Sequence, residues 1–182
     1  MIPGPMNAGL SIDELAAAEL PAAVPALAGV LHACVHGGAS VGFVLPFPME
    51  EAAAFWRGLL PAFRQGDRLL LVARLEGRIV GTAQLVLAMP PNGRHRAEIA
   101  KVLVHPEARR RGIAAALMRA AEAAARQHGR RLLLLDTTTG RDAERLYAGL
   151  GYQRLAVVPG YARDPDGTLG PTSIMTKELA DA

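Results

Sequence analysis

The chain has 182 residues, of which 51% are hydrophobic and 20% are charged, with a formal net charge of +3 and a pI of about 9.5. This composition indicates a globular rather than a disordered protein, and the length suits one well-buried core better than two. Only 4% of the residues are aromatic, which disfavours base stacking on nucleic acid although the positive charge would permit such binding.

We expect a single domain over residues 10–182 after a Pro/Gly-rich tail at residues 1–9. The first residues show no basic segment followed by an apolar one, so we predict no signal peptide. The apolar stretch from Leu20 to Val35 contains two prolines and is too short to span a bilayer. The single cysteine, Cys34, cannot form an internal disulfide, which suits a reducing cytoplasm. We expect its side chain to pack in the core as a small hydrophobic group.

The first half of the chain predicts a short strand at Leu10–Ile12 and an apolar helix that ends near His36. The small-residue loop from Gly37 to Phe43 would let a ligand approach its backbone, or it is a plain helix connection. Met49 to Phe63 has apolar residues at helical spacing, which predicts a second amphipathic helix with Trp56 in the core.

Two alternating stretches, Leu69–Leu75 and Ile79–Leu87, surround Glu76-Gly77-Arg78 and predict a β-hairpin. The second strand is expected to end in the turn Pro90 to Gly93. These two strands would lead into the stretch that carries the chemistry, Glu98 to Leu117.

The stretch from Glu98 to Leu117 predicts a buried strand, a tight turn and the start of a helix. The strand run Val102-Leu103-Val104 is β-prone, Pro106 ends it because proline lacks an N–H donor, and Ala114 to Ala125 is strongly helix-prone.

The turn between this strand and helix reads Arg109-Arg110-Arg111-Gly112-Ile113-Ala114. Gly112 and Ala114 leave little side chain in the way, so a phosphate could approach the free N–H groups and the positive end of the helix dipole. The three arginines add positive charge. An ordinary basic helix N-terminus is the alternative.

The second half predicts a fully apolar strand, Arg131 to Asp136, of the kind covered on both faces of a sheet. Thr137 to Gly140 is expected to turn into a short helix, Arg141 to Leu150, and a further strand would begin at Gly151-Tyr152.

The pattern formed by Arg109, Gly112 and Ala114, after Val-His-Pro and before an Ala/Leu helix, resembles the signature of the Gcn5-related N-acetyltransferase (GNAT) family. The segment from Ala143 to Tyr152 resembles a second family hallmark, A-x-x-x-Y-x-x-x-G-Y/F. This resemblance implies an α+β fold with α/β/α layers, in which helices flank a central mixed, mostly antiparallel and splayed sheet.

The same resemblance implies that acetyl-CoA is the co-substrate. Its pyrophosphate would lie against the backbone of the arginine- and glycine-rich turn, made of Arg109, Arg110, Arg111, Gly112, Ile113 and Ala114. Its pantetheine amides would pair with the preceding strand, Val102, Leu103 and Val104.

Within the family the chain resembles the tabtoxin resistance group. The likeness is carried by Leu135-Asp136-Thr137, by Ala143-Glu144 ahead of Tyr147, and by the long loop from Pro159 to Thr172. It implies acetylation of a small amine, with the toxin as one example, and dimers are common in the family.

Amine acetylation needs a group that takes the amine proton and a donor for the departing thiolate. Glu98 and Asp136 are carboxylates that could face one cleft between neighbouring strands, and either could act directly or through water. The resemblance implies that these two positions are the bases and that Tyr147 is the acid. Alternatively, Glu98 is a solvated strand residue, Asp136 caps the following turn, and Tyr147 only packs.

The histidines predict no metal site, because none of them is spaced from a carboxylate or a cysteine as metal ligands are. His105 lies in the corner between strand and turn, beside Pro106, and is not expected to be catalytic.

The sequence therefore predicts a cytoplasmic, acetyl-CoA-dependent N-acetyltransferase that acts on the amine of a small molecule by direct attack in a ternary complex. The acceptor would be amino-acid-like or toxin-like, and no nucleic acid or membrane partner is expected. Two alternatives stay open: a non-catalytic acyl-CoA-binding regulatory module on the same fold, and acetylation of a protein N-terminus or lysine.

Overall fold

The computed structural model describes residues 9–180, so the predicted tail lies outside the described residues except for its last position. The strands are β1 (Leu10–Glu14), β2 (Arg68–Leu75), β3 (Arg78–Val86), β4 (Arg96–Val104), β5 (Leu132–Thr138), β6 (Gln153–Arg163) and β7 (Leu169–Glu178). The helices are α1 (Leu20–His36), α2 (Met49–Gly58), α3 (Leu60–Arg64), α4 (Ile113–Gln127) and α5 (Asp142–Gly149), with short 3-10 turns η1 (Pro91–Gly93) and η2 (Pro106–Ala108).

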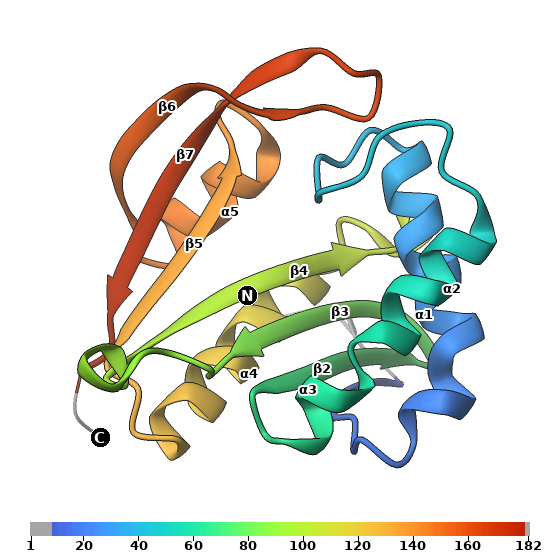
Figure 1. Cartoon of the computed structure of the whole chain (residues 1–182), viewed down its shortest axis with the longest axis horizontal. Helices are drawn as coiled ribbons and strands as arrows, with labels where there is room; N and C mark the ends of the chain where they lie inside the picture. Colours follow the sequence, from blue (N-terminus) through green and yellow to red (C-terminus); the bar gives the residue numbers. More distant parts are fainter. Residues whose placement is uncertain (1–8, 181–182) are drawn as a thin grey trace, which may run out of the picture.

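The strands form one sheet in the order β1-β2-β3-β4-β5-β7-β6. Neighbouring strands are antiparallel except β4 and β5, which run parallel. Figure 1 shows β4 and β5 starting side by side and then running apart. The predicted α+β fold with a mixed, mostly antiparallel, splayed sheet is confirmed.

Two apolar cores lie on opposite faces of the sheet. On one face, α1 and α2 pack against the alternate strand residues Leu70 and Val72, and Trp56 is fully buried there as predicted. On the other face, α4 packs over the intervening strand residues, such as Leu71, Leu85 and Ile99. This separation follows from the period-two alternation of strand side chains.

The predicted hairpin is confirmed. Its turn lies at Glu76 and Gly77, both with positive φ of 50° and 78°, which is the geometry that suits a tight connection between twisted antiparallel strands. β1 then pairs with the outer edge of β2.

The helix predicted from Met49 to Phe63 is instead two helices, α2 and α3. Pro61, near the start of α3, has no N–H to continue the hydrogen-bond ladder, and Gly58 weakens the end of α2. The helical spacing in the sequence was correct, but the break between the two helices was missed.

The prediction that the apolar β5 run is covered on both faces was wrong. Leu133 and Leu135 are buried, whereas Leu132 and Leu134 are only half-buried. Leu132 and Leu134 belong to neither apolar core, because α1 and α2 pack against residues of β2 and β4 but not against β5.

The long loop predicted from Pro159 to Thr172 is largely the hairpin between β6 and β7. Arg163 pairs with Leu169, and the turn between them closes with hydrogen bonds from Asp164 N–H to Thr168 O and from Gly167 N–H to Asp164 O. Pro159 and Gly160 suggested a loop, but they fall where the register between β6 and β7 shifts, so the pairing resumes beyond them.

Among residues 9–180, none of the helices has the length and apolar character needed to cross a bilayer.

Candidate active site

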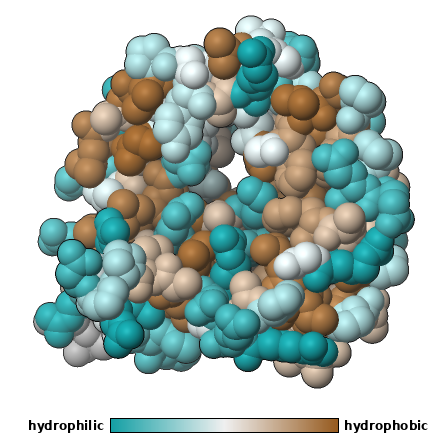
Figure 2. All heavy atoms as spheres, viewed as in Figure 1, coloured by the Kyte–Doolittle hydropathy of each residue, from teal (hydrophilic) through white to brown (hydrophobic). Residues whose placement is uncertain are grey.

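The divergence of β4 and β5 opens the centre of the sheet. The two strands pair only where Arg96–Glu98 lies beside Leu132–Leu134. Within the described residues, no strand then covers the β5 side of β4 from Ile99 to Val104. Figure 2 shows a hollow at this position in the middle of the molecule.

The predicted pantetheine-binding residues Val102, Leu103 and Val104 lie on this open edge. A free strand edge presents unpaired N–H and C=O groups, so an extended ligand that contains amides can add to it as a further strand would. The geometry therefore fits the predicted pairing.

The loop that follows the open edge carries free backbone N–H groups. Arg110 and Gly112 have left-handed φ values of 64° and 74°, and α4 begins directly afterwards at Ile113. Within the described chain, the N–H groups of residues 110–115 make no hydrogen bond. A Cβ at Gly112 would meet nothing within 4 Å, so the space in front of these donors is open.

Successive free N–H groups at the N-terminus of a 15-residue helix fit an anionic ligand, because they point outward and the helix dipole is positive there. Arg110 and Arg111 are exposed beside them. Arg109 instead turns back, and its Nε donates to the carbonyl of Val104 at 3.3 Å. Arg109 thus ties the loop to the end of β4.

Two of the three predicted catalytic residues, Glu98 and Asp136, lie at the opening, and the third, Tyr147, lies in the core on the α4 face, near enough for the Asp136 carboxylate to act on it. Glu98 lies opposite Leu134, and Asp136 is two residues further along β5, so both carboxylates lie on the same face of the sheet. Both residues are exposed. Tyr147, from α5, is buried, and burial together with the Asp136 carboxylate raises the pKa of its phenol. The phenol is therefore protonated at neutral pH, as an ordinary tyrosine also is, and it is a weaker acid than an exposed phenol.

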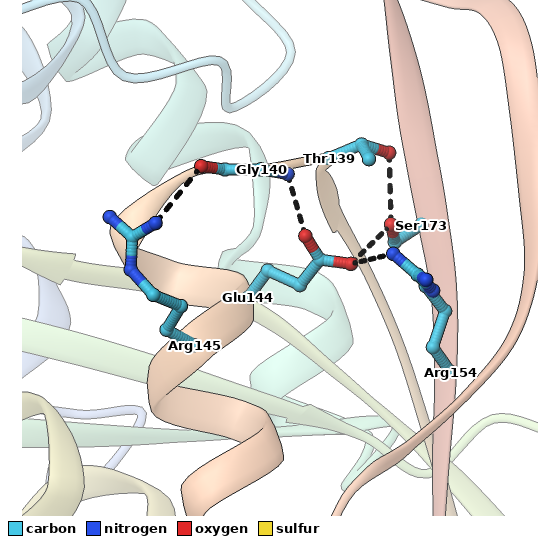
Figure 3. A network of polar contacts seen from close by, with 6 residues as sticks. All are labelled: Thr139, Gly140, Glu144, Arg145, Arg154 and Ser173. Atoms are coloured by element: carbon cyan, nitrogen blue, oxygen red, sulfur yellow. Dashed lines mark hydrogen bonds and ion pairs between the residues drawn. The ribbon is translucent and has the colours of Figure 1, made fainter.

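A polar network fixes the helix that carries Tyr147. Glu144, one turn earlier, accepts hydrogen bonds from Ser173 Oγ at 2.7 Å, from Gly140 N–H at 2.6 Å and from Arg154 at 3.1 Å (Figure 3). These partners come from the loop after β5 and from both strands of the β6–β7 hairpin. Glu144 thereby joins α5 to the strands that wall one side of the opening.

Two other residues considered from the sequence, His105 and Cys34, make contacts that stabilise the fold. His105 Nδ1 accepts a hydrogen bond from Glu107 N–H at 3.4 Å and so caps the turn after β4. Cys34 is buried, its Sγ donates to Val104 O at 3.3 Å, and burial raises the pKa of the thiol. A thiol in this state is a poor nucleophile.

A depression of about 360 Å³ lies elsewhere, between α1 and the start of α3. It is lined by Leu20, Pro21, Val24, Pro25, Arg57 and Leu60. This lining offers no carboxylate and no neutral proton donor, unlike the opening in the sheet.

Sequence reasoning missed Lys101. Its side chain is half-buried at the same opening, where Asp136 and Glu98 act on its charge. The signal in the sequence was a single lysine inside the otherwise apolar run from Ile99 to Val104.

The open edge of β4 leads to a run of free backbone N–H groups, with two carboxylates nearby. This arrangement fits an extended anionic ligand that contains amides. Residues 38–152 match the model of the acetyltransferase (GNAT) family. The chain belongs to this family, whose acetyltransferases use acetyl-CoA.

One relative is an uncharacterised N-acetyltransferase in the hisH-hisA intergenic region of Azospirillum brasilense. It is 38% identical over 104 residues, which cover 56% of this chain and 60% of that protein. The aligned part thus spans less than two thirds of the length of this relative.

Solved structures share the fold. A ribosomal-protein-alanine N-acetyltransferase from Brucella melitensis is 24% identical with a TM-score of 0.76, over 93% of this chain and 99% of that chain. The putative acetyltransferase yncA from Salmonella typhimurium, solved with its cofactor acetyl-CoA, is 18% identical with a TM-score of 0.75, over 96% of each chain. A putative phosphinothricin N-acetyltransferase is 19% identical with a TM-score of 0.76, over 94% of this chain and 99% of that chain.

Proposed function

We propose that this protein transfers the acetyl group of acetyl-CoA to the amine of a small, amino-acid-like molecule by direct attack in a ternary complex. The observation that carries the proposal is that Glu98 and Asp136 share one face of the sheet where β4 leaves β5, with the buried phenol of Tyr147 close enough for the Asp136 charge to act on it. The resemblance to the tabtoxin resistance group, in which the matching positions are the proposed bases and acid, supports it.

The binding of acetyl-CoA would use backbone groups. The unpaired N–H groups of residues 110–115, with Arg110 and Arg111 beside them, would hold the pyrophosphate. The open edge at Val102–Val104 would pair with the pantetheine amides and direct the thioester toward the gap.

The carboxylates would prepare the acceptor. At neutral pH an amine is mostly an ammonium ion, which cannot attack a carbonyl. Glu98 or Asp136 would take this proton, directly or through a water molecule, and the free amine would then form its bond to the acetyl carbon. Their negative charge would also attract the cationic acceptor into the gap.

Tyr147 would complete the reaction. As the carbon–sulfur bond breaks, its phenol would give a proton to the departing CoA sulfur. The match of Tyr147 to the proposed acid of the tabtoxin resistance group supports this role. The raised pKa adds no support, because an ordinary tyrosine is also protonated at neutral pH.

The test combines acetyl-CoA binding by calorimetry with thiol release against small amines, amino acids and a peptide that starts with alanine. Tight binding with amine-dependent thiol release supports the proposal. Release only with the peptide would favour protein acetylation, as the name of the Brucella structure suggests for that protein. Tight binding without release on any acceptor would favour a regulatory acyl-CoA-binding module.

We also propose that the protein acts in the cytoplasm as a homodimer. Its only cysteine is buried as a thiol, and the edge strand β6 exposes Leu155, Val157 and Val158. Apolar side chains on an edge strand favour pairing with another chain. Light scattering coupled to gel filtration would give the mass in solution, and a monomer at all concentrations would overturn this proposal.

A further inference from the structure

Lys101 lies at an irregularity in β4. Opposite it on β3, Thr82 pairs with Leu103 and Gln84 pairs with Ala100, so two residues of β4 share the place of one. Lys101 has a φ of 51°, a left-handed backbone conformation that a residue with a long side chain rarely adopts. The buried Thr82 hydroxyl donates to Lys101 O at 2.9 Å and stabilises this bulge.

The bulge directs the lysine side chain toward α2 and the loop before it. Its Nζ lies 5.6 Å from the centre of the Phe55 ring and 6.0 Å from that of Phe43. The two rings are nearly perpendicular, with centroids 5.3 Å apart, and so form a corner around the ammonium. A Cβ at Gly42 would lie 3.7 Å from Nζ, so the loop backbone also comes close.

The ammonium keeps its hydrogen-bonding capacity. Among the contacts of residues 9–180, Lys101 Nζ makes no hydrogen bond and no ion pair. Aromatic faces attract a cation but accept no strong hydrogen bond, so the three N–H donors remain for another partner. A half-buried cation without an acceptor is costly unless a ligand supplies one.

Charges of both signs surround this position. Asp136 and Glu98 act on Lys101 from the opening, and Arg68 acts on it from β2, where its guanidinium donates to Gln84 Oε1 at 2.8 Å. Burial lowers the pKa of Lys101 and the neighbouring Arg68 adds to this effect, while the two carboxylates oppose it. Glu98 and Asp136 thus give the opening a negative charge on one side, and Lys101 and Arg68 give it a positive charge on the other.

We propose that Lys101 determines acceptor specificity by binding a carboxylate, or an anionic group of similar size, on the same molecule whose amine is acetylated. Glu98 and Asp136 would face the amine while the ammonium held between Phe43 and Phe55 faces the anion. This inference rests on the proposed function and adds to it the residue that selects an amino acid over a simple amine.

The test compares L-amino acids with their carboxamides and their decarboxylated amines. The wild type should show the highest kcat/KM on the amino acids. Lys101→Met should lower kcat/KM about 100-fold on amino acids and less than threefold on amides and amines, because only the carboxylate loses its partner. The KM for acetyl-CoA should not change.

Three further variants keep the test decisive. Lys101→Gly suits the left-handed backbone and should lose the same preference, which guards against misfolding of Lys101→Met. Lys101→Arg keeps the positive charge and should retain part of the preference for amino acids. Arg78→Met, which removes an exposed positive charge at the far end of β3, should change nothing. An equal loss on amino acids and amides, or no preference in the wild type, would overturn the inference.

A binding measurement separates this inference from the proposed function. Amino acids are titrated by calorimetry into protein saturated with CoA. If the wild type releases no thiol with any acceptor, the proposed function fails. Amino-acid binding that disappears in Lys101→Met would still support the role of Lys101, and binding that is absent or unchanged would overturn it.

Discussion

Glu98 on β4 and Leu134 on β5 form the last residue pair that joins these two strands. The free edge of β4 and the Asp136 carboxylate lie just beyond this pair, and the Asp136 charge acts on the phenol of Tyr147. Where the ladder stops, backbone groups become available to a ligand, and side chains from two strands face the same space. The candidate site is thus a consequence of an incomplete sheet.

Tyr147→Phe should lower kcat about 100-fold with little change in acetyl-CoA affinity, because the variant keeps the ring and loses only the proton donor. The buried ring packs in the core and should still do so. Steady-state thiol release and calorimetry measure the two quantities. An unchanged kcat would remove Tyr147 from the role of acid, and a parallel loss of affinity would indicate a packing role.

Glu98→Gln and Asp136→Asn should identify the base. The variant that removes the base should lose about 100-fold or more in kcat at pH 7, and the other should lose less than tenfold. Both residues are exposed, so neither change should affect folding. Glu51→Gln, on the exposed face of α2, is the matched control. Full thiol release by the double variant would rule out both carboxylates.

The sequence was sufficient to predict the features that depend on local preference. The Glu76-Gly77 turn, the β-prone end of β4 and the alanine-rich α4 each formed as expected, because turn chemistry, β-branching and helix propensity act over a few residues. The prediction of an α+β fold with a splayed sheet followed from a family resemblance, which is carried by β4, the loop at Gly112 and α4.

Other features depend on contacts between distant segments and were missed. The bulge at Lys101 exists because β3 and β4 pair with unequal numbers of residues, which no short stretch encodes. The half-buried state of Leu134 depends on where β5 leaves β4. The hydrogen bonds of Glu144 to Ser173 and Arg154 join residues 29 and 10 positions apart.

Gly112→Val should weaken acetyl-CoA binding by tenfold or more. Gly112 has a φ of 74°, which a β-branched residue adopts only with strain of about 1–3 kcal/mol, so the loop should move its free N–H groups away from the pyrophosphate. No steric clash is expected, since a Cβ there meets nothing within 4 Å. Gly112→Asn tolerates the left-handed conformation and should bind nearly as the wild type. Calorimetry with acetyl-CoA measures both, and intact affinity in Gly112→Val would exclude this loop as the phosphate site.

Glu144→Gln should destabilise the fold in a pH-dependent way. Hydrogen bonds from Ser173 and Gly140, and the Arg154 guanidinium, lower the pKa of this carboxyl below its usual value of 4.5. A lowered carboxyl pKa contributes stability that is present above pH 4.5 and is lost as the pH falls through the folded-state pKa.

The expected difference in unfolding free energy between wild type and Glu144→Gln is about 1 kcal/mol at neutral pH, kept small by solvent near the ion pair. Urea unfolding at several pH values measures it, and the difference should shrink steadily below pH 4.5. Glu51→Gln, which removes an exposed carboxylate, should show no such trend. A difference that stays constant with pH would mean that the charge of Glu144 does not stabilise the junction of α5 with the β6–β7 hairpin.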